Sequence, residues 1–217
     1  MGRDKTIFVL RLFLIGFLLS FSSGSRAITA DISRNENTNY AFIGVHVISM
    51  LSERVLKNQI VIVKQGKITQ IINNDDISLP ENIIRINAHG KYLLPGLSDM
   101  HTHIRGEEDL LLYLATGVTT LRNLSGSEDI LTLISKIDKG EVLGPELYST
   151  SPILEGENFT WPFSVKITDP SEADSLIKGY KENGYQAIKI YHTISKPVHE
   201  AIVKAGLKYN IPIVGHV

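Results

Sequence analysis

Cysteine is absent from this 217-residue sequence, which excludes disulfide bonds, zinc–thiolate sites and cysteine nucleophiles. Neither sign of charge is in excess, since 22 lysines and arginines face 23 aspartates and glutamates, for a formal net charge of -1. This balance gives no electrostatic reason to expect a nucleic-acid partner. Apolar residues make up 43% of the chain, as in globular proteins, and the length suits one or two domains.

Long apolar runs are also missing, except near the N-terminus. There, Arg3, Lys5 and Arg11 precede the apolar run LFLIGFLLSF and the small residues of SSGSRAITA. A run of about ten apolar residues suits a secretory signal peptide and is short for a membrane-spanning helix. We therefore predict a signal peptide over residues 1–27 and an exported protein, periplasmic or secreted. Only an uncleaved N-terminal segment would bring the chain to a membrane.

The next segments have different compositions. Residues 28–39 are polar and are predicted to be a linker. Residues 40–92 contain alternating apolar and β-branched residues, which is typical of strands. In QIVIVKQGKITQII, Gly66 can adopt a positive φ and predicts a tight hairpin. This region is expected to form a small antiparallel β unit, part of a β-sandwich.

From residue 93 to residue 217, five strand-like segments alternate with four helical ones. Such alternation predicts parallel βαβ units. A closed eight-unit barrel takes roughly 250 residues, so this region fits a little over half of one. The predicted fold class is therefore α/β: an incomplete (β/α)8 TIM barrel of about five strands, preceded by the β-sandwich part. A self-contained, doubly wound five-stranded sheet is the alternative.

The segment LLPGLSDMHTHI places two histidines at the end of an apolar strand. Because side chains alternate along a strand, Asp99, His101 and His103 are expected on one face. Two imidazoles at positions i and i+2 can bind one metal ion at the carboxyl end of a strand, where α/β folds carry their chemistry. A pair of ordinary exposed histidines fits the same spacing.

Two later strands carry further candidate ligands at the same end. In QAIKIYH, Lys189 lies inside an apolar strand, where burial favours the neutral amine. A neutral amine can react with carbon dioxide to give a carbamate, which is an oxygen ligand. In IPIVGHV, His216 again ends an apolar strand. Three strands thus each deliver a group that can bind a metal.

These segments, with GVTTLRN and GPELYSTSPIL, resemble the metal-dependent amidohydrolase superfamily, and within it the imidazolonepropionase-like and prolidase-like branch. The resemblance runs from about Tyr40 to Val217. It implies that His101 and His103 match the strand 1 ligands of the barrel, Lys189 the carbamylated lysine and His216 the strand 5 histidine.

The resemblance also implies a chemistry. One or two divalent ions, usually zinc, would be held with a carbamylated Lys189 and would activate a water molecule. The expected reaction is hydrolysis of a carbon–nitrogen bond in a small-molecule substrate: a non-peptide amide, a cyclic amide or a dipeptide. A strand 8 aspartate would act as general base and acid in the family.

The sequence departs from the family pattern after its fifth strand. The strand 6 histidine and the strand 8 aspartate would lie beyond Val217, so this chain contains no catalytic aspartate that matches. We therefore expect a truncated form with weak activity or none. The alternative is a non-catalytic binding or assembly module derived from an amidohydrolase.

Three more residues are candidates for substrate contact or for orienting a ligand. Asp99 precedes the histidine pair, and a structural acid paired with the backbone is favoured there over a residue that orients a ligand. Arg122 could bind an anionic substrate group, or form a surface ion pair. Tyr191 shares a strand face with Lys189, so it lines the pocket or serves packing. Trp161, the single tryptophan, is expected to be a loop packing anchor rather than a substrate contact.

Overall fold

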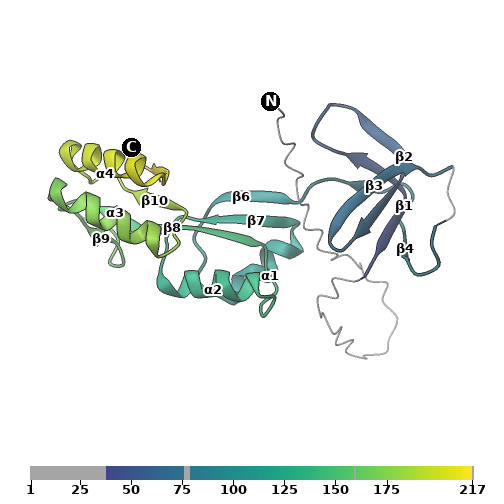
Figure 1. Ribbon diagram of the computed structural model, residues 1–217, viewed down its shortest axis with the longest axis horizontal. Helices are drawn as coiled ribbons and strands as arrows, with labels where there is room; N and C mark the ends of the chain where they lie inside the picture. Colours follow the sequence, from purple (N-terminus) through teal and green to yellow (C-terminus); the bar gives the residue numbers. More distant parts are fainter. Residues whose placement is uncertain (1–37, 76–78, 159, 217) are drawn as a thin grey trace. The chain divides into compact units, whose positions relative to one another are not determined.

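The computed structural model describes residues 38–75, 79–158 and 160–216, and their contacts divide into two compact units between Gly96 and Leu97 (Figure 1). This division falls a few residues after the predicted domain boundary at Tyr92. The predicted signal peptide and nearly all of the predicted linker lie outside the described residues. Within the described part of the chain, no helix is long and apolar enough to cross a membrane.

The first unit is a five-stranded sheet with the order β3-β2-β1-β4 and with β5 paired to β1. Its strands are β1 (Tyr40–Ile48), β2 (Val55–Lys64), β3 (Lys67–Asn73), β4 (Ile84–Asn87) and β5 (Tyr92–Leu93). The predicted hairpin is confirmed, because β2 and β3 pair antiparallel around Gln65 and Gly66. Both turn residues have positive φ, 50° and 72°, as a tight two-residue hairpin requires.

Strands β4 and β5 pair parallel with β1, so the prediction of a wholly antiparallel unit is wrong. Parallel pairing depends on the path of the connection between two strands, and residue alternation does not encode that path. Apolar side chains pack on both faces of the sheet. One cluster contains Phe42, Val45 and Val61, whereas Ala41 and Ile60 belong to another cluster.

The second unit is built from parallel strands and helices in alternation. Its strands are β6 (Leu97–Thr102), β7 (Val118–Asn123), β8 (Glu146–Glu155), β9 (Val165–Lys166), β10 (Ala187–Ile190) and β11 (Ile213–Gly215). Its helices are α1 (Glu107–Ala115), α2 (Glu128–Asp138), the 3-10 helix η1 (Pro170–Glu172), α3 (Ala173–Glu182) and α4 (Lys196–Tyr209). Figure 1 shows this unit in teal to yellow.

The strand order of this unit distinguishes the two predicted folds. The order is β6-β7-β8-β10-β11, with the two-residue strand β9 beside β8, and all pairs are parallel. Consecutive strands are therefore neighbours, as in a barrel, whereas a doubly wound sheet reverses its strand order at a switch point. The predicted partial TIM barrel is confirmed, and the doubly wound alternative is wrong.

A serine stands at the N-cap of both α2 and α4, but only one of the two makes a side-chain capping bond. Ser127 caps α2, because its hydroxyl accepts a hydrogen bond from the Ile130 N–H (3.3 Å). Ser195 stands at the N-cap of α4 but makes no side-chain capping bond. Ser195 is followed by Lys196 and Pro197, and a proline in the first turn removes one donor that a cap would satisfy.

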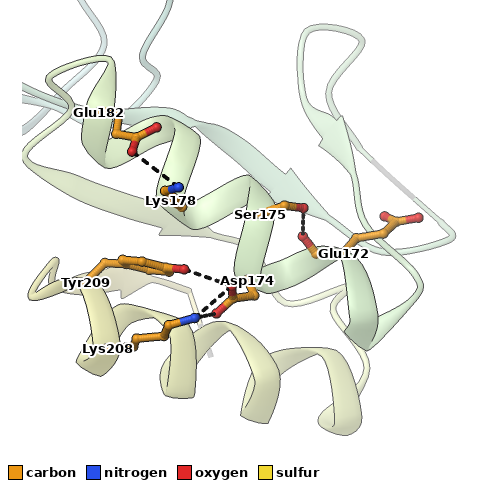
Figure 2. A network of polar contacts seen from close by, with 7 residues as sticks. All are labelled: Glu172, Asp174, Ser175, Lys178, Glu182, Lys208 and Tyr209. Carbon is orange, nitrogen blue, oxygen red and sulfur yellow. Dashed lines mark hydrogen bonds and ion pairs between the residues drawn. The ribbon is translucent and has the colours of Figure 1, made fainter.

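Helices α3 and α4 are joined on their outer surface by a polar network (Figure 2). The Asp174 carboxylate accepts hydrogen bonds from Lys208 Nζ at 2.7 and 2.9 Å and from the Tyr209 hydroxyl at 2.8 Å. Beneath it, Ile177 and Ile202 are fully buried in the apolar core of this half of the unit. Since Asp174 and Lys208 are more than half exposed, the apolar core supplies most of the stability of this helix pair.

Candidate metal centre

Strand β6 carries the histidine pair at its carboxyl end. Thr102 and Ile104 are buried, with 3% and 6% exposure, whereas His101 and His103 are exposed on the opposite side. This alternation follows from the strand geometry and aims both imidazoles away from the helix-covered face. The two ring centroids lie 5.5 Å apart.

Strands β10 and β11 bring two further predicted residues to the same place. Lys189 pairs in register with Val214, and the strand pairing ends at Gly215, directly before His216. The His216 N–H donates to the Ile190 carbonyl (3.3 Å), which continues the ladder to that residue. The ring of His216 lies 5.6 Å from that of His101. Residues from three strands, far apart in sequence, therefore meet at one end of the sheet.

The spacing of the rings is compatible with a shared metal ion. A zinc–nitrogen distance of about 2 Å puts two imidazole centroids on one tetrahedral ion roughly 5 Å apart. However, among the described residues, no three His, Asp or Glu side chains are arranged as a metal-binding group by themselves. The three imidazoles are close neighbours, and Lys189 lines the same cavity as a further candidate donor.

Lys189 is the largest fully buried side chain of the described chain, at 1% exposure. Burial lowers the pKa of its amine below the ordinary 10.5, and the positive charge of Arg122 lowers it further. Within the described residues, the amine has no hydrogen-bond or ion-pair partner, while the backbone N–H of Lys189 donates to Ser151 Oγ (3.0 Å). A lysine held in this way has an increased fraction of neutral, nucleophilic amine.

The histidines share this electrostatic setting. Burial lowers the pKa of both His101 and His103, and the charge of Lys189 adds to the effect. For His216 the charge of Lys189 is the main cause of a lowered pKa, followed by burial. Asp99 acts in the opposite direction on His101. All three imidazoles are therefore favoured in the neutral form, which is the form that binds metal ions.

A cavity of about 1260 Å³ lies beside this cluster. The two histidines of β6, Lys189 and His216 all line it, and so does Tyr191, as predicted. The Tyr191 ring lies 4.8 Å from the ring of His216. The cavity is large enough for a small-molecule substrate in contact with the histidine cluster.

Asp99 and Arg122 do not line this cavity. The register between β6 and β7 shifts between Asp99 and Thr102, so strict alternation does not hold from Asp99 to His101. Asp99 Oδ1 accepts a hydrogen bond from the backbone N–H of His101 (3.1 Å), which agrees with a structural role. Arg122 Nε donates to the Met100 carbonyl (2.8 Å), and the guanidinium has no ion-pair partner in the part of the chain that the structure describes.

Sequence reasoning missed Glu155 and undervalued Trp161. Glu155 ends β8 and is completely buried. Trp161 and Phe163 stack on each other (centroids 5.8 Å apart, planes at 24°) and line the same cavity. They are 41% and 59% exposed, so Trp161 packs on Phe163 within the loop and also faces the cavity. Two aromatics with spacing i and i+2 in a polar loop were the available signal.

Comparisons with known proteins found relatives in sequence and in structure. No model of a known protein family matches the sequence. A dihydroorotase of Parasynechococcus marenigrum (strain WH8102) is 29% identical over 93 residues, which are 43% of this chain and 26% of that protein. A prolidase-like protein from Bifidobacterium longum is structurally similar, with a TM-score of 0.73 and 24% identity, over 83% of this chain and 49% of the other.

Two further solved structures are similar at lower identity. A molinate hydrolase has a TM-score of 0.72 and 21% identity, over 84% of this chain and 54% of its own. A Xaa-Pro dipeptidase solved with methionine in its active site has a TM-score of 0.70 and 17% identity, over 83% and 57%. This chain thus spans about half the length of the solved chains. The predicted resemblance to the amidohydrolase superfamily is confirmed by these prolidase-like and amidohydrolase-like relatives.

Proposed function

We propose, starting from this likeness to the amidohydrolase superfamily, that the chain belongs to a metal-dependent hydrolase. The enzyme would cleave carbon–nitrogen bonds in small amides or dipeptides in the compartment to which it is exported. One observation carries the proposal: His101, His103, Lys189 and His216 come from three strands and line one cavity. The relatives support the hydrolase class, since they include a dihydroorotase, a molinate hydrolase and a Xaa-Pro dipeptidase.

The donor set fits a divalent cation better than any other group. Imidazole nitrogens suit zinc, and the three imidazoles are favoured in the neutral form. Lys189 becomes a ligand only after its neutral amine has formed a carbamate, and its lowered pKa supports this step. When bound, the metal would lower the pKa of a water molecule and polarise the substrate carbonyl.

The other residues of the chain have supporting roles in this proposal. Asp99 fixes the backbone at His101 through its hydrogen bond and so orients the first histidine. The positive charge of Arg122 adds to burial in lowering the pKa of Lys189, while its guanidinium is held by the Met100 carbonyl outside the cavity. Tyr191 contacts the ring of His216 and limits its rotation.

Metal binding by the full 217-residue chain tests the proposal directly. After incubation with Zn²⁺ and bicarbonate and removal of free metal, we expect at least one zinc ion per chain by elemental analysis. His101→Ala and Lys189→Ala should each lower the zinc content severalfold. His89→Ala is the matched control, because His89 belongs to the first unit and does not line the cavity.

Carbamylation has its own readout. With ¹³C-bicarbonate, a carbamate carbon signal should appear in the NMR spectrum of the chain and be absent in Lys189→Ala. Fewer than one zinc ion per chain, together with no carbamate signal, would contradict the proposal. That result would instead favour a non-catalytic binding module built on the same fold.

A further inference from the structure

The segment that follows β8 leads into strand β9, which lies beside the end of β8. Strand β9 pairs parallel with the end of β8, with Leu154 opposite Val165 and Glu155 opposite Lys166. Between them, residues 160–164 carry the two stacked aromatic rings that line the large cavity. We call Trp161 and Phe163 the aromatic pair. Because the flanking strands β8 and β9 are paired, the position of this segment relative to the sheet is fixed.

A buried carboxylate holds the segment in place. Glu155 has no exposed surface, and its oxygens accept hydrogen bonds from the backbone N–H groups of Thr160 (2.9 Å) and Trp161 (3.0 Å) and from the Ser164 hydroxyl. The Ser164 N–H also donates to the Trp161 carbonyl (3.0 Å), which closes a turn within the segment. Charge-assisted bonds of this kind are among the stronger hydrogen bonds, so the aromatic pair is positioned rather than loosely attached.

The pKa of Glu155 agrees with this role. Burial alone would raise the pKa, but the hydrogen bonds from Ser164, Trp161 and Thr160 outweigh burial and lower it below the ordinary value. The carboxylate is therefore charged at neutral pH, and its hydrogen bonds go to the segment. Glu155 is not among the residues that line the large cavity.

The aromatic pair itself is exposed although it is held firmly. Exposed aromatic rings that line a cavity offer an apolar surface that a ligand in the cavity can cover. Both rings line the cavity that also contains His101, His103 and Lys189. A substrate whose scissile bond lies at the histidine cluster can therefore place an adjoining group against the aromatic pair within the same cavity.

We infer that Trp161 and Phe163 form the specificity-determining site for a flat, apolar ring of the substrate, and that Glu155 is the residue that positions them. Aromatic contacts of this kind favour an aromatic or saturated ring over a small aliphatic group. The inference deepens the proposed function, on which it depends for the location of the scissile bond, by assigning ring-bearing amides as the substrate class.

Because Trp161 is the only tryptophan, its fluorescence reports directly on this site. The probes are N-acetyl-phenylalaninamide and N-acetyl-alaninamide, added separately to the metal-free, full 217-residue chain. We expect the aromatic amide to change Trp161 emission and to bind about 2- to 10-fold more tightly than the alanine amide. Equal affinity for the two amides would overturn the inference.

Variants locate the preference. Phe163→Ala should remove it, and Phe163→Tyr should keep it, whereas Leu207→Ala on α4 is a control at another exposed apolar residue. Glu155→Gln should weaken the preference and shift Trp161 emission while the far-UV circular dichroism of the helices stays unchanged. A preference that persists in Phe163→Ala would overturn the ring site, and one unaffected by Glu155→Gln would overturn the positioning role.

These experiments distinguish a failure of the metal proposal from a failure of the aromatic site. His101→Ala should lose zinc and keep the preference for the aromatic amide, because the probes are tested without metal. Zinc binding without any ring preference would refute the aromatic site alone. A ring preference without zinc binding would refute the metal centre alone.

Discussion

Two buried ionisable side chains at the ends of neighbouring strands are treated in opposite ways by this fold. Glu155 at the end of β8 is surrounded by hydrogen-bond donors, which stabilise its charge. Lys189 in β10 is equally buried, yet its amine has no partner among the described residues and its charge is disfavoured by burial and by Arg122. Glu155 maintains structure, whereas the Lys189 side chain lines the cavity and is available for chemistry.

Replacing the hydrogen-bonded Glu155 should have the largest effect on stability. Glu155→Leu would leave the N–H groups of Thr160 and Trp161 and the Ser164 hydroxyl without their acceptor. We expect the free energy of unfolding in urea to fall by about 3 kcal/mol, since each unmade buried bond costs about 1–3 kcal/mol and solvent recovers part of it. Glu157→Leu is the matched control.

Glu157 lies two residues along the same segment and pairs with Lys166 at the surface, with 71% of its side chain exposed. Its replacement should change the unfolding free energy by less than about 0.5 kcal/mol. If the two variants were equally destabilised, the hydrogen bonds of Glu155 would not be what stabilises this segment.

A smaller effect is expected on the pH dependence of stability. The folded-state pKa of Glu155 lies below the ordinary 4.5, because three hydrogen bonds outweigh burial. Its stabilising contribution is therefore fully present above the unfolded-state pKa and is lost as the pH falls through the lower folded-state value. Urea unfolding between pH 6 and pH 3 should show a steeper loss for the wild type than for Glu155→Gln. Parallel pH profiles would contradict the assignment.

The contrast between these two residues also marks what sequence could and could not predict. Lys189 was found because a lysine within the apolar segment QAIKIYH is anomalous by itself. Glu155 ends β8, where ELYSTSPILE mixes polar and apolar residues, and its partners are mainly backbone N–H groups, which every residue except proline has. No residue pattern announces them, so only the folded segment reveals that the acid is satisfied.

The same distinction applies to the fold. The hairpin at Gly66 is local, and its residues predicted it. The parallel pairing of β4 with β1 and the register shift after Asp99 depend on distant strands, and both were missed. The histidine pair lies between these cases: His101 and His103 follow local alternation, whereas their proximity to His216 came from the expected order of strands.

Replacing Lys189 should have the smallest effect on stability, and this effect should have the opposite sign to that of Glu155→Leu. Lys189→Met keeps the apolar stem and replaces an amine that lacks a partner. In metal-free protein at pH 7, we expect the unfolding free energy to be unchanged or to rise by about 1 kcal/mol, because burying the cation costs free energy that no ion pair returns. Zinc binding should be lost in the same variant. Urea unfolding with and without zinc measures both effects, and Lys178→Met, on the exposed surface of α3, is the control. A loss of more than about 1 kcal/mol in metal-free Lys189→Met would mean that the amine is held by the fold as firmly as Glu155, and the contrast between the two residues would disappear.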